Sequence, residues 1–179
     1  MRILSIVSLL ALSFATQADT VGGHCEGEGV RLNFTDGIAF ADARSEAGAI
    51  STAIYLTVEK LDRAALTACP DCGGALPATR FASSRGYTVQ KQTQKGWMEV
   101  NHVGGEMNVT SVVDVPYLDE GGTLTGLSGA EHLVVTFVER SDKRVTGTVK
   151  TVVDEYSDPS TDMDCDVTFD LAVGWPAKS

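Results

Sequence analysis

The chain has 179 residues, of which 24 are acidic and 14 are basic, so its net charge at neutral pH is −10. An acidic surface repels phosphate backbones and anionic lipid headgroups, whereas nucleic-acid binding depends largely on lysine and arginine. The composition therefore argues against nucleic acid as a partner. The length suits a single domain with one well-developed core.

The first 18 residues have the pattern of a secretory signal peptide. Met1-Arg2 is a short basic start, residues 3–14 are apolar apart from three serines, and Thr16-Gln17-Ala18 places small residues where a signal peptidase inspects the chain. An apolar stretch of about twelve residues is shorter than the roughly twenty that a membrane-spanning helix needs. We therefore expect a signal peptide over residues 1–18, no stable membrane anchor, and a periplasmic or secreted protein whose residues 19–179 form one β-rich domain.

After this segment, period-two alternation predicts short antiparallel strands bounded by turn residues. Residues 30–34 alternate, Asp36-Gly37 has the residue types of a tight hairpin turn, and residues 38–40 form the expected return strand. Residues 50–59 are rich in β-branched side chains and predict a third strand. Residues 61–68 (LDRAALTA) are the one convincing helical stretch, and the following CPDCGG ends it.

The clearest predicted hairpin spans residues 97–113, with Gly104-Gly105 as its two-residue turn. Counting outwards from the turn pairs His102 with Met107, Val100 with Val109 and Met98 with Ser111 on the core face. Upstream, residues 87–94 are expected to add a strand whose three glutamines share a solvated face.

Two more strands, residues 132–139 and 144–153, are expected to form a hairpin around residues 141–143. The last strand has the most regular alternation, and its inward side chains are Met163, Cys165, Val167, Phe169, Leu171 and Val173. About nine strands and one short helix favour a single-domain all-β fold, an antiparallel β-sandwich, with a partly open β-barrel as the alternative.

Four cysteines in an exported chain predict two disulfides, and three pairings are possible. The arrangement we favour joins Cys25 to Cys165 and closes Cys69-Pro-Asp-Cys72 on itself. A redox CxxC is expected between a strand and a helix N-terminus, whereas this one follows the predicted helix. A zinc ribbon would need a second CxxC pair, which the sequence lacks. We therefore interpret Cys69 and Cys72 as a loop-locking disulfide.

Acidic residues crowd the region before the last strand and suggest a calcium-type site as an alternative function, because hard cations need several converging carboxylates. Along one strand face, however, alternate carboxylates lie roughly 6.5 to 7 Å apart, which is too far for chelation unless the preceding loop folds back. A solvated polar face is the simpler interpretation. The candidate ligands are Asp154, Glu155, Asp158, Asp162 and Asp164.

The sequence supplies no catalytic residues. Gly126-Leu-Ser128-Gly-Ala130 lacks the final glycine of a nucleophile elbow, and the three histidines offer no recognisable triad. A small secreted hydrolase is therefore the third functional alternative, and no cofactor is expected.

A basic interval is the best candidate for a partner-binding surface. No carboxylate occurs between Asp71 and Glu99, whereas four basic residues fall there: Arg80, Arg85, Lys91 and Lys95. In an otherwise acidic chain these cations are either ordinary solvated residues or a surface that steers a charged partner.

Residues 29–43 (GVRLNFTDGIAFADA), followed by residues 54–66 (IYLTVEKLDRAAL), resemble a loose group of uncharacterised exported bacterial β-domain proteins. In that group a strand pair ending in small residues leads to a further strand and a short helix. The resemblance covers about a quarter of the chain and implies export, but it brings no functional residues. We expect a non-catalytic binding or accessory protein of the cell envelope, for example of the inhibitor or immunity type, whose partner is an unknown protein or envelope ligand.

Overall fold

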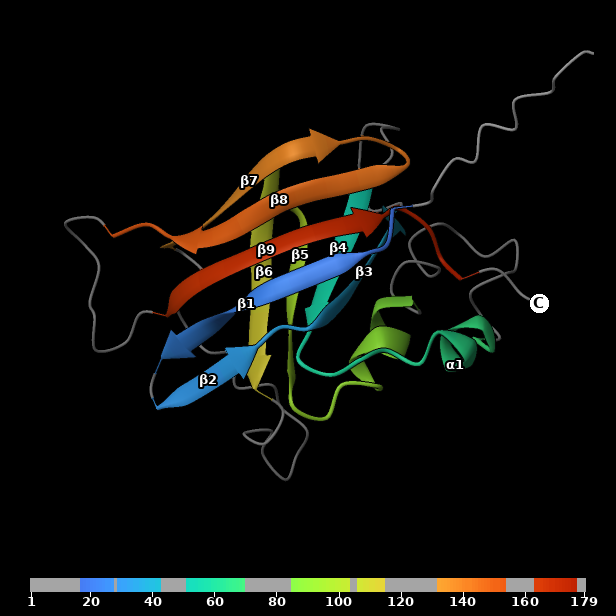
Figure 1. Cartoon of the computed structure of the whole chain (residues 1–179), viewed down its shortest axis with the longest axis horizontal. Coiled ribbons are helices and arrows are strands. Elements are labelled where there is room, and N and C mark those ends of the chain that lie inside the picture. Colours follow the sequence, from blue (N-terminus) through green and yellow to red (C-terminus); the bar gives the residue numbers. More distant parts are fainter. Residues whose placement is uncertain are drawn as a thin grey trace, which may run out of the picture.

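The computed structural model describes residues 17–27, 29–42, 51–69, 85–103, 106–114, 132–153 and 163–176. The strands within these ranges form two antiparallel sheets that pack face to face (Figure 1), which confirms the predicted all-β sandwich. Sheet A has the order β2-β1-β9-β8-β7, and sheet B has the order β3-β4-β5-β6. The bounds in sheet A are β1 (Thr20–Gly27), β2 (Val30–Asn33), β7 (Leu133–Arg140), β8 (Arg144–Thr151) and β9 (Asp164–Ala172); those in sheet B are β3 (Asp36–Asp42), β4 (Ser51–Thr57), β5 (Gly96–Val103) and β6 (Glu106–Asp114).

The main core lies between the two sheets and follows the alternation of the sequence. In β9, Cys165, Val167, Phe169 and Leu171 are buried while their neighbours face solvent, as predicted. Across the interface they meet apolar residues of sheet B, including Ile54, Leu56, Met98 and Val100. Burial of this apolar surface is the main favourable term in the folding of such a sandwich.

A second, smaller core covers the opposite face of sheet B. Here Phe40, Tyr55 and Trp97 pack against Leu66 of α1 (Arg63–Thr67) and Val89 of a helical segment, residues 85–90. Figure 1 shows these two helical elements near each other, beside the strands of the sandwich. Because β4 and β5 are covered on both faces, their buried residues form continuous runs instead of alternating.

The predicted strand at residues 87–94 is wrong, because residues 85–90 are helical. The three glutamines mimic a period of two, but Arg85, Val89 and Thr93 are spaced by four and share the face turned towards the protein. Val89 and Thr93 are buried, and Arg85 is partly buried. Side chains four apart lie on one face of a helix, so the packing of this face decides the conformation.

The predicted hairpin over residues 30–40 is also wrong, since β2 belongs to sheet A and β3 to sheet B. The chain crosses between the sheets at Phe34 and Thr35, and β2 pairs with β1 instead. Asp36 is not a turn residue here. Its carboxylate accepts hydrogen bonds from the Gly37 and Leu61 main-chain N–H groups, at 2.7 and 2.8 Å, and from the Arg63 guanidinium at 2.7 Å.

The predicted hairpin register of β5 and β6 is confirmed near its turn and shifts further out. Val100 pairs with Val109 and His102 with Met107, as expected. A bulge between Glu99 and Val100 then moves Met98 opposite Val112 instead of Ser111. The extra residue is left unpaired in the ladder, which increases the local twist of the strand pair.

The chain after β9 ties the layers together. The Val173 N–H donates to the Lys143 carbonyl in sheet A, and the Gly174 N–H donates to the Ala39 carbonyl in sheet B, both at 2.8 Å. Trp175 then reaches the helical layer, where its indole N–H donates to the Leu66 carbonyl at 3.3 Å. These contacts fix the position of the aromatic ring that packs against Arg85.

Candidate binding surface

The helical segment 85–90 is held on sheet B by close packing at its start. Gly86 lies over Tyr55, and a Cβ atom at this position would be 2.3 Å from the Tyr55 hydroxyl oxygen. A side chain here would therefore push the segment away from the sheet, because Tyr55 is itself buried. Downstream, the Gln92 side chain accepts from the Asp62 N–H at 2.9 Å and donates to the Asp62 carbonyl at 3.2 Å. These contacts join the segment to the start of α1.

Of the four basic residues in the candidate surface, Arg85 packs inside the helical layer. Its guanidinium carbon lies 5.8 Å from the centre of the Phe40 ring and 5.2 Å from that of Trp175. Burial lowers the pKa of Arg85 to about 10, so this cation remains charged at neutral pH. Stacking on aromatic rings offsets part of the cost of removing the charge from water. Arg85 is thus engaged within the protein, and Arg80 lies outside the described residues.

Lys91 and Lys95 are exposed, and Lys91 lies beside an aromatic side chain that the sequence pattern did not single out. Tyr87 is 58% exposed, and the Lys91 ammonium lies 4.3 Å from the centre of its ring. The two residues are four apart, which brings them together on the outer side of the helical segment. Lys95 forms a loose ion pair with Glu59, at 3.9 Å. We call Tyr87, Lys91 and Lys95 the basic surface.

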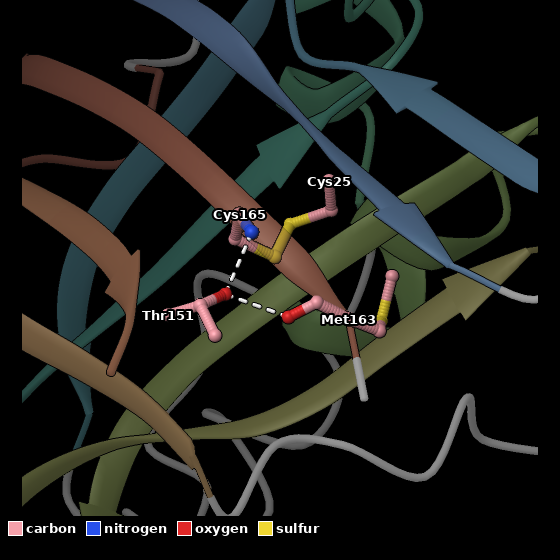
Figure 2. Close-up of a disulfide and its surroundings, with 4 residues drawn as sticks. All are labelled: Cys25, Thr151, Met163 and Cys165. Atoms are coloured by element: carbon pink, nitrogen blue, oxygen red, sulfur yellow. Dashed lines mark hydrogen bonds between the residues drawn. A yellow bond between two sulfur atoms is a disulfide. The ribbon is translucent and has the colours of Figure 1, made fainter. Parts of the chain in front are cut away.

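The predicted disulfide between Cys25 and Cys165 is present and connects β1 to β9 (Figure 2). Both cysteines are buried, and they lie directly opposite each other in the strand register. The Thr151 hydroxyl at the end of β8 donates to the Met163 carbonyl at 2.6 Å and accepts from the Cys165 N–H at 2.7 Å. One threonine therefore fixes the start of β9 beside the disulfide.

Cys69 is also disulfide-bonded, while Cys72, its predicted partner, lies outside the described residues. The Cys69 sulfur is 3.5 Å from the Thr88 hydroxyl oxygen, so the end of α1 contacts the helical segment 85–90. The loop-locking role of Cys69 and Cys72 stays a prediction.

Most of the candidate calcium ligands also fall outside the described ranges: Asp154, Glu155, Asp158 and Asp162. Asp164 is exposed at the start of β9, where it pairs in register with Glu26 of β1. Within the described ranges, no three acidic, histidine or cysteine side chains converge as a metal site would require. Further along β9, Asp166 forms an exposed ion pair with Lys150 at 3.2 Å.

Two polar residues of β5, Glu99 and Asn101, are buried, although the sequence pattern did not predict this. Glu99 and Asn101 follow each other on the same face of β5, are 9% and 4% exposed, and are joined by a 3.1 Å hydrogen bond from the Asn101 amide to the Glu99 carboxylate. Alternation alone would have assigned both residues to solvent. They lie on the same face of β5 as Trp97, which is buried in the second core.

Comparison with protein-family models, curated proteins and solved structures gives no match to this chain. In the described part of the chain, none of the helices has the length and hydrophobicity needed to span a bilayer.

Proposed function

We propose that this protein is an exported, non-catalytic binding protein of the cell envelope, and that it recognises an acidic partner through the basic surface. The observation that carries the proposal is the exposed Tyr87 ring with the Lys91 ammonium 4.3 Å away, in a chain of net charge −10. Tyrosine combines a large apolar area with a polar tip, and it is enriched at protein interfaces. Lys91 against the ring, together with the exposed Lys95 four residues later in the chain, would steer an acidic partner towards it.

Export is supported by the signal-like N-terminus and by the buried Cys25–Cys165 disulfide, since structural disulfides persist in oxidising compartments. Cleavage after Ala18 would leave sheet A complete, because β1 begins at Thr20. Intact-mass measurement on protein from a periplasmic extract should give a chain that begins at Asp19 and contains two disulfides. A protein that keeps Met1, or that is found in the cytoplasm, would contradict export.

The binding proposal is tested with the variant Tyr87→Ser/Lys91→Glu/Lys95→Glu. These side chains are exposed or partly exposed, so the fold should be retained. The control is Lys143→Glu/Lys150→Glu, which makes the same change in charge on the β7–β8 hairpin. The unmodified protein, the basic-surface variant and the control variant are each used as bait in envelope extracts. The association kinetics of every captured protein are then measured with all three.

A specific acidic partner should bind the unmodified protein and the control but associate roughly tenfold more slowly with the basic-surface variant at low salt. The difference should shrink as salt is raised, because screening weakens interactions between exposed charges. Equal slowing in both variants would mean that only net charge matters. Unchanged kinetics in the basic-surface variant would show that binding uses another surface.

A further inference from the structure

Strand β7 forms one rim of sheet A and pairs with β8 on one side (Figure 1). Within the described part of the chain, no strand pairs with its other side. The strand is eight residues long and carries exposed valines: Val134 is 47% exposed and Val138 is 82% exposed. A long edge with β-branched side chains is a template for pairing with another strand.

The hydrogen-bond pattern identifies which main-chain groups this edge offers. The Val152 N–H donates to the His132 carbonyl at 2.9 Å, so residues 132 and 152 are a hydrogen-bonded pair. In an antiparallel ladder such pairs alternate, and the register makes Val134 and Thr136 the next residues bonded to β8. The residues between them direct their N–H and C=O groups towards the free edge: Leu133, Val135 and Phe137.

The charged end of β7 limits how far a partner strand could pair. A bulge between Phe137 and Glu139 leaves Val138 without a partner on β8, and Glu139 and Arg140 follow it. Bulges and charges are the devices that block pairing at exposed sheet edges. Residues 133–137 are regular and carry neither device, so a partner strand would pair with this segment.

Residues 133–137 are complementary to themselves. When two copies are placed antiparallel about a two-fold axis at Val135, Val135 faces its own equivalent and Leu133 faces Phe137 of the second copy. With the symmetry-related contact of Phe137 and Leu133, this gives three hydrogen-bonded pairs, and their apolar side chains lie on the core face of the sheet. On the outer face, Val134 faces Thr136 of the second copy. Such a symmetric contact closes on itself instead of growing into a filament.

We propose that this protein forms a symmetric homodimer in which the two β7 strands pair antiparallel about Val135, joining two copies of sheet A into one continuous sheet. This surface is separate from the basic surface, and the proposal does not depend on the acidic partner.

Analytical ultracentrifugation of the purified mature protein tests the dimer. Its weight-average mass should rise towards twice the monomer mass as the concentration is raised. Val135→Lys and Val135→Glu should each remain monomeric, because the register places like charges directly opposite each other. An equimolar mixture of the two should regain the dimer, most strongly at low salt. Val138 lies outside the paired segment, so Val138→Lys and Val138→Glu should dimerise like the unmodified protein.

A third variant, Val135→Pro, removes an N–H group directed at the free edge and no hydrogen bond of the β7–β8 ladder, and it replaces one partly buried apolar side chain by another. It should be monomeric, with a circular dichroism spectrum like that of the unmodified protein. This variant tests the dimer if the charged variants fold poorly. The proposal is overturned if the unmodified protein stays monomeric, as it would if a different protein occupied this edge. It is also overturned if the dimer persists in the Val135 variants, or if folded Val135→Lys and Val135→Glu fail to pair when mixed.

Discussion

Asp170 on β9 accepts hydrogen bonds from three side chains. The Arg144 Nε donates at 2.5 Å, the Thr146 hydroxyl at 2.8 Å and the Gln17 amide at 2.6 Å. The hydrogen bond from Arg144 is the main cause of a pKa for Asp170 below its ordinary value of 3.8. Cleavage after Ala18 would remove Gln17, but it would leave the contacts with Arg144 and Thr146.

This lowered pKa has a defined effect on stability. Between the folded and unfolded pKa values of Asp170, the unfolded chain binds more protons, so stability increases with pH in that range. The contribution of the ionised carboxylate is fully present above about pH 5 and is lost as the pH falls below about 4 and through the folded pKa.

We therefore predict that Asp170→Asn lowers the thermal midpoint at neutral pH, and that the difference from the unmodified protein shrinks on acidification towards about pH 2. The control is Asp166→Asn, since an exposed ion pair such as Asp166–Lys150 contributes only about 0 to 1 kcal/mol. Thermal melts between pH 2 and pH 7 provide the comparison. A difference for Asp170→Asn that stays constant over this range would exclude the ionised carboxylate as its source.

The basic residues of the candidate surface differ in how far the sequence predicts their roles. The basic interval is visible in the sequence because acids are absent from it. The separate roles of its members are not visible, because Arg85 packs against Phe40 and Trp175, which lie 45 residues before it and 90 after it. Tyr87 and Lys91 could have been paired from their spacing of four, had the segment been interpreted as a helix.

Among the elements, those with one solvated face were predicted from alternation alone. Strands β7, β8 and β9 follow the expected segments closely, because in the described ranges only one face of sheet A packs against another layer. Sheet B was harder, since the helical layer buries its second face and removes the polar half of the pattern. Alternation also cannot tell a hairpin from a crossing, which is why β2 and β3 were assigned to one sheet.

The bulges are a second feature that alternation does not reveal. The register of β5 and β6 could be counted from the Gly104-Gly105 turn only as far as Val100, where an additional residue enters the ladder. A similar irregularity in β7 separates a regular half from a charged half. The positions of these two bulges depend on the local twist and on the packing between strands, so the alternation of apolar and polar residues does not predict them.

For the molecule as a whole, the Cys25–Cys165 disulfide closes a loop with a sequence separation of 140 residues. By the chain-entropy argument, a crosslink of this length contributes about 5 kcal/mol through its effect on the unfolded chain, whereas the predicted Cys69–Cys72 loop contributes much less. We predict that Cys25→Ala/Cys165→Ala lowers the thermal midpoint far more than Cys69→Ala/Cys72→Ala. Differential scanning calorimetry of both variants checks the order.

Alanine is chosen because a serine hydroxyl would be buried at Cys25 and Cys165 without a designed partner. Equal losses in the two variants would mean that loop length does not govern the effect. Peptide mapping that joined Cys25 to Cys69 or Cys72 would contradict the pairing.

The place of β9 in the middle of sheet A has a consequence for how the protein is made. Strand β1 is synthesised early, yet one of its neighbours is β9, some 140 residues later. A growing chain folds progressively only where early segments find early partners, and contacts between distant segments form slowly. Before residues 164–172 have left the ribosome, β1 and β8 each lack one of their two partner strands, and the disulfide cannot form. Sheet A can therefore be completed only when synthesis is nearly finished. This late completion would suit the proposed export, because a translocation channel takes an unfolded chain.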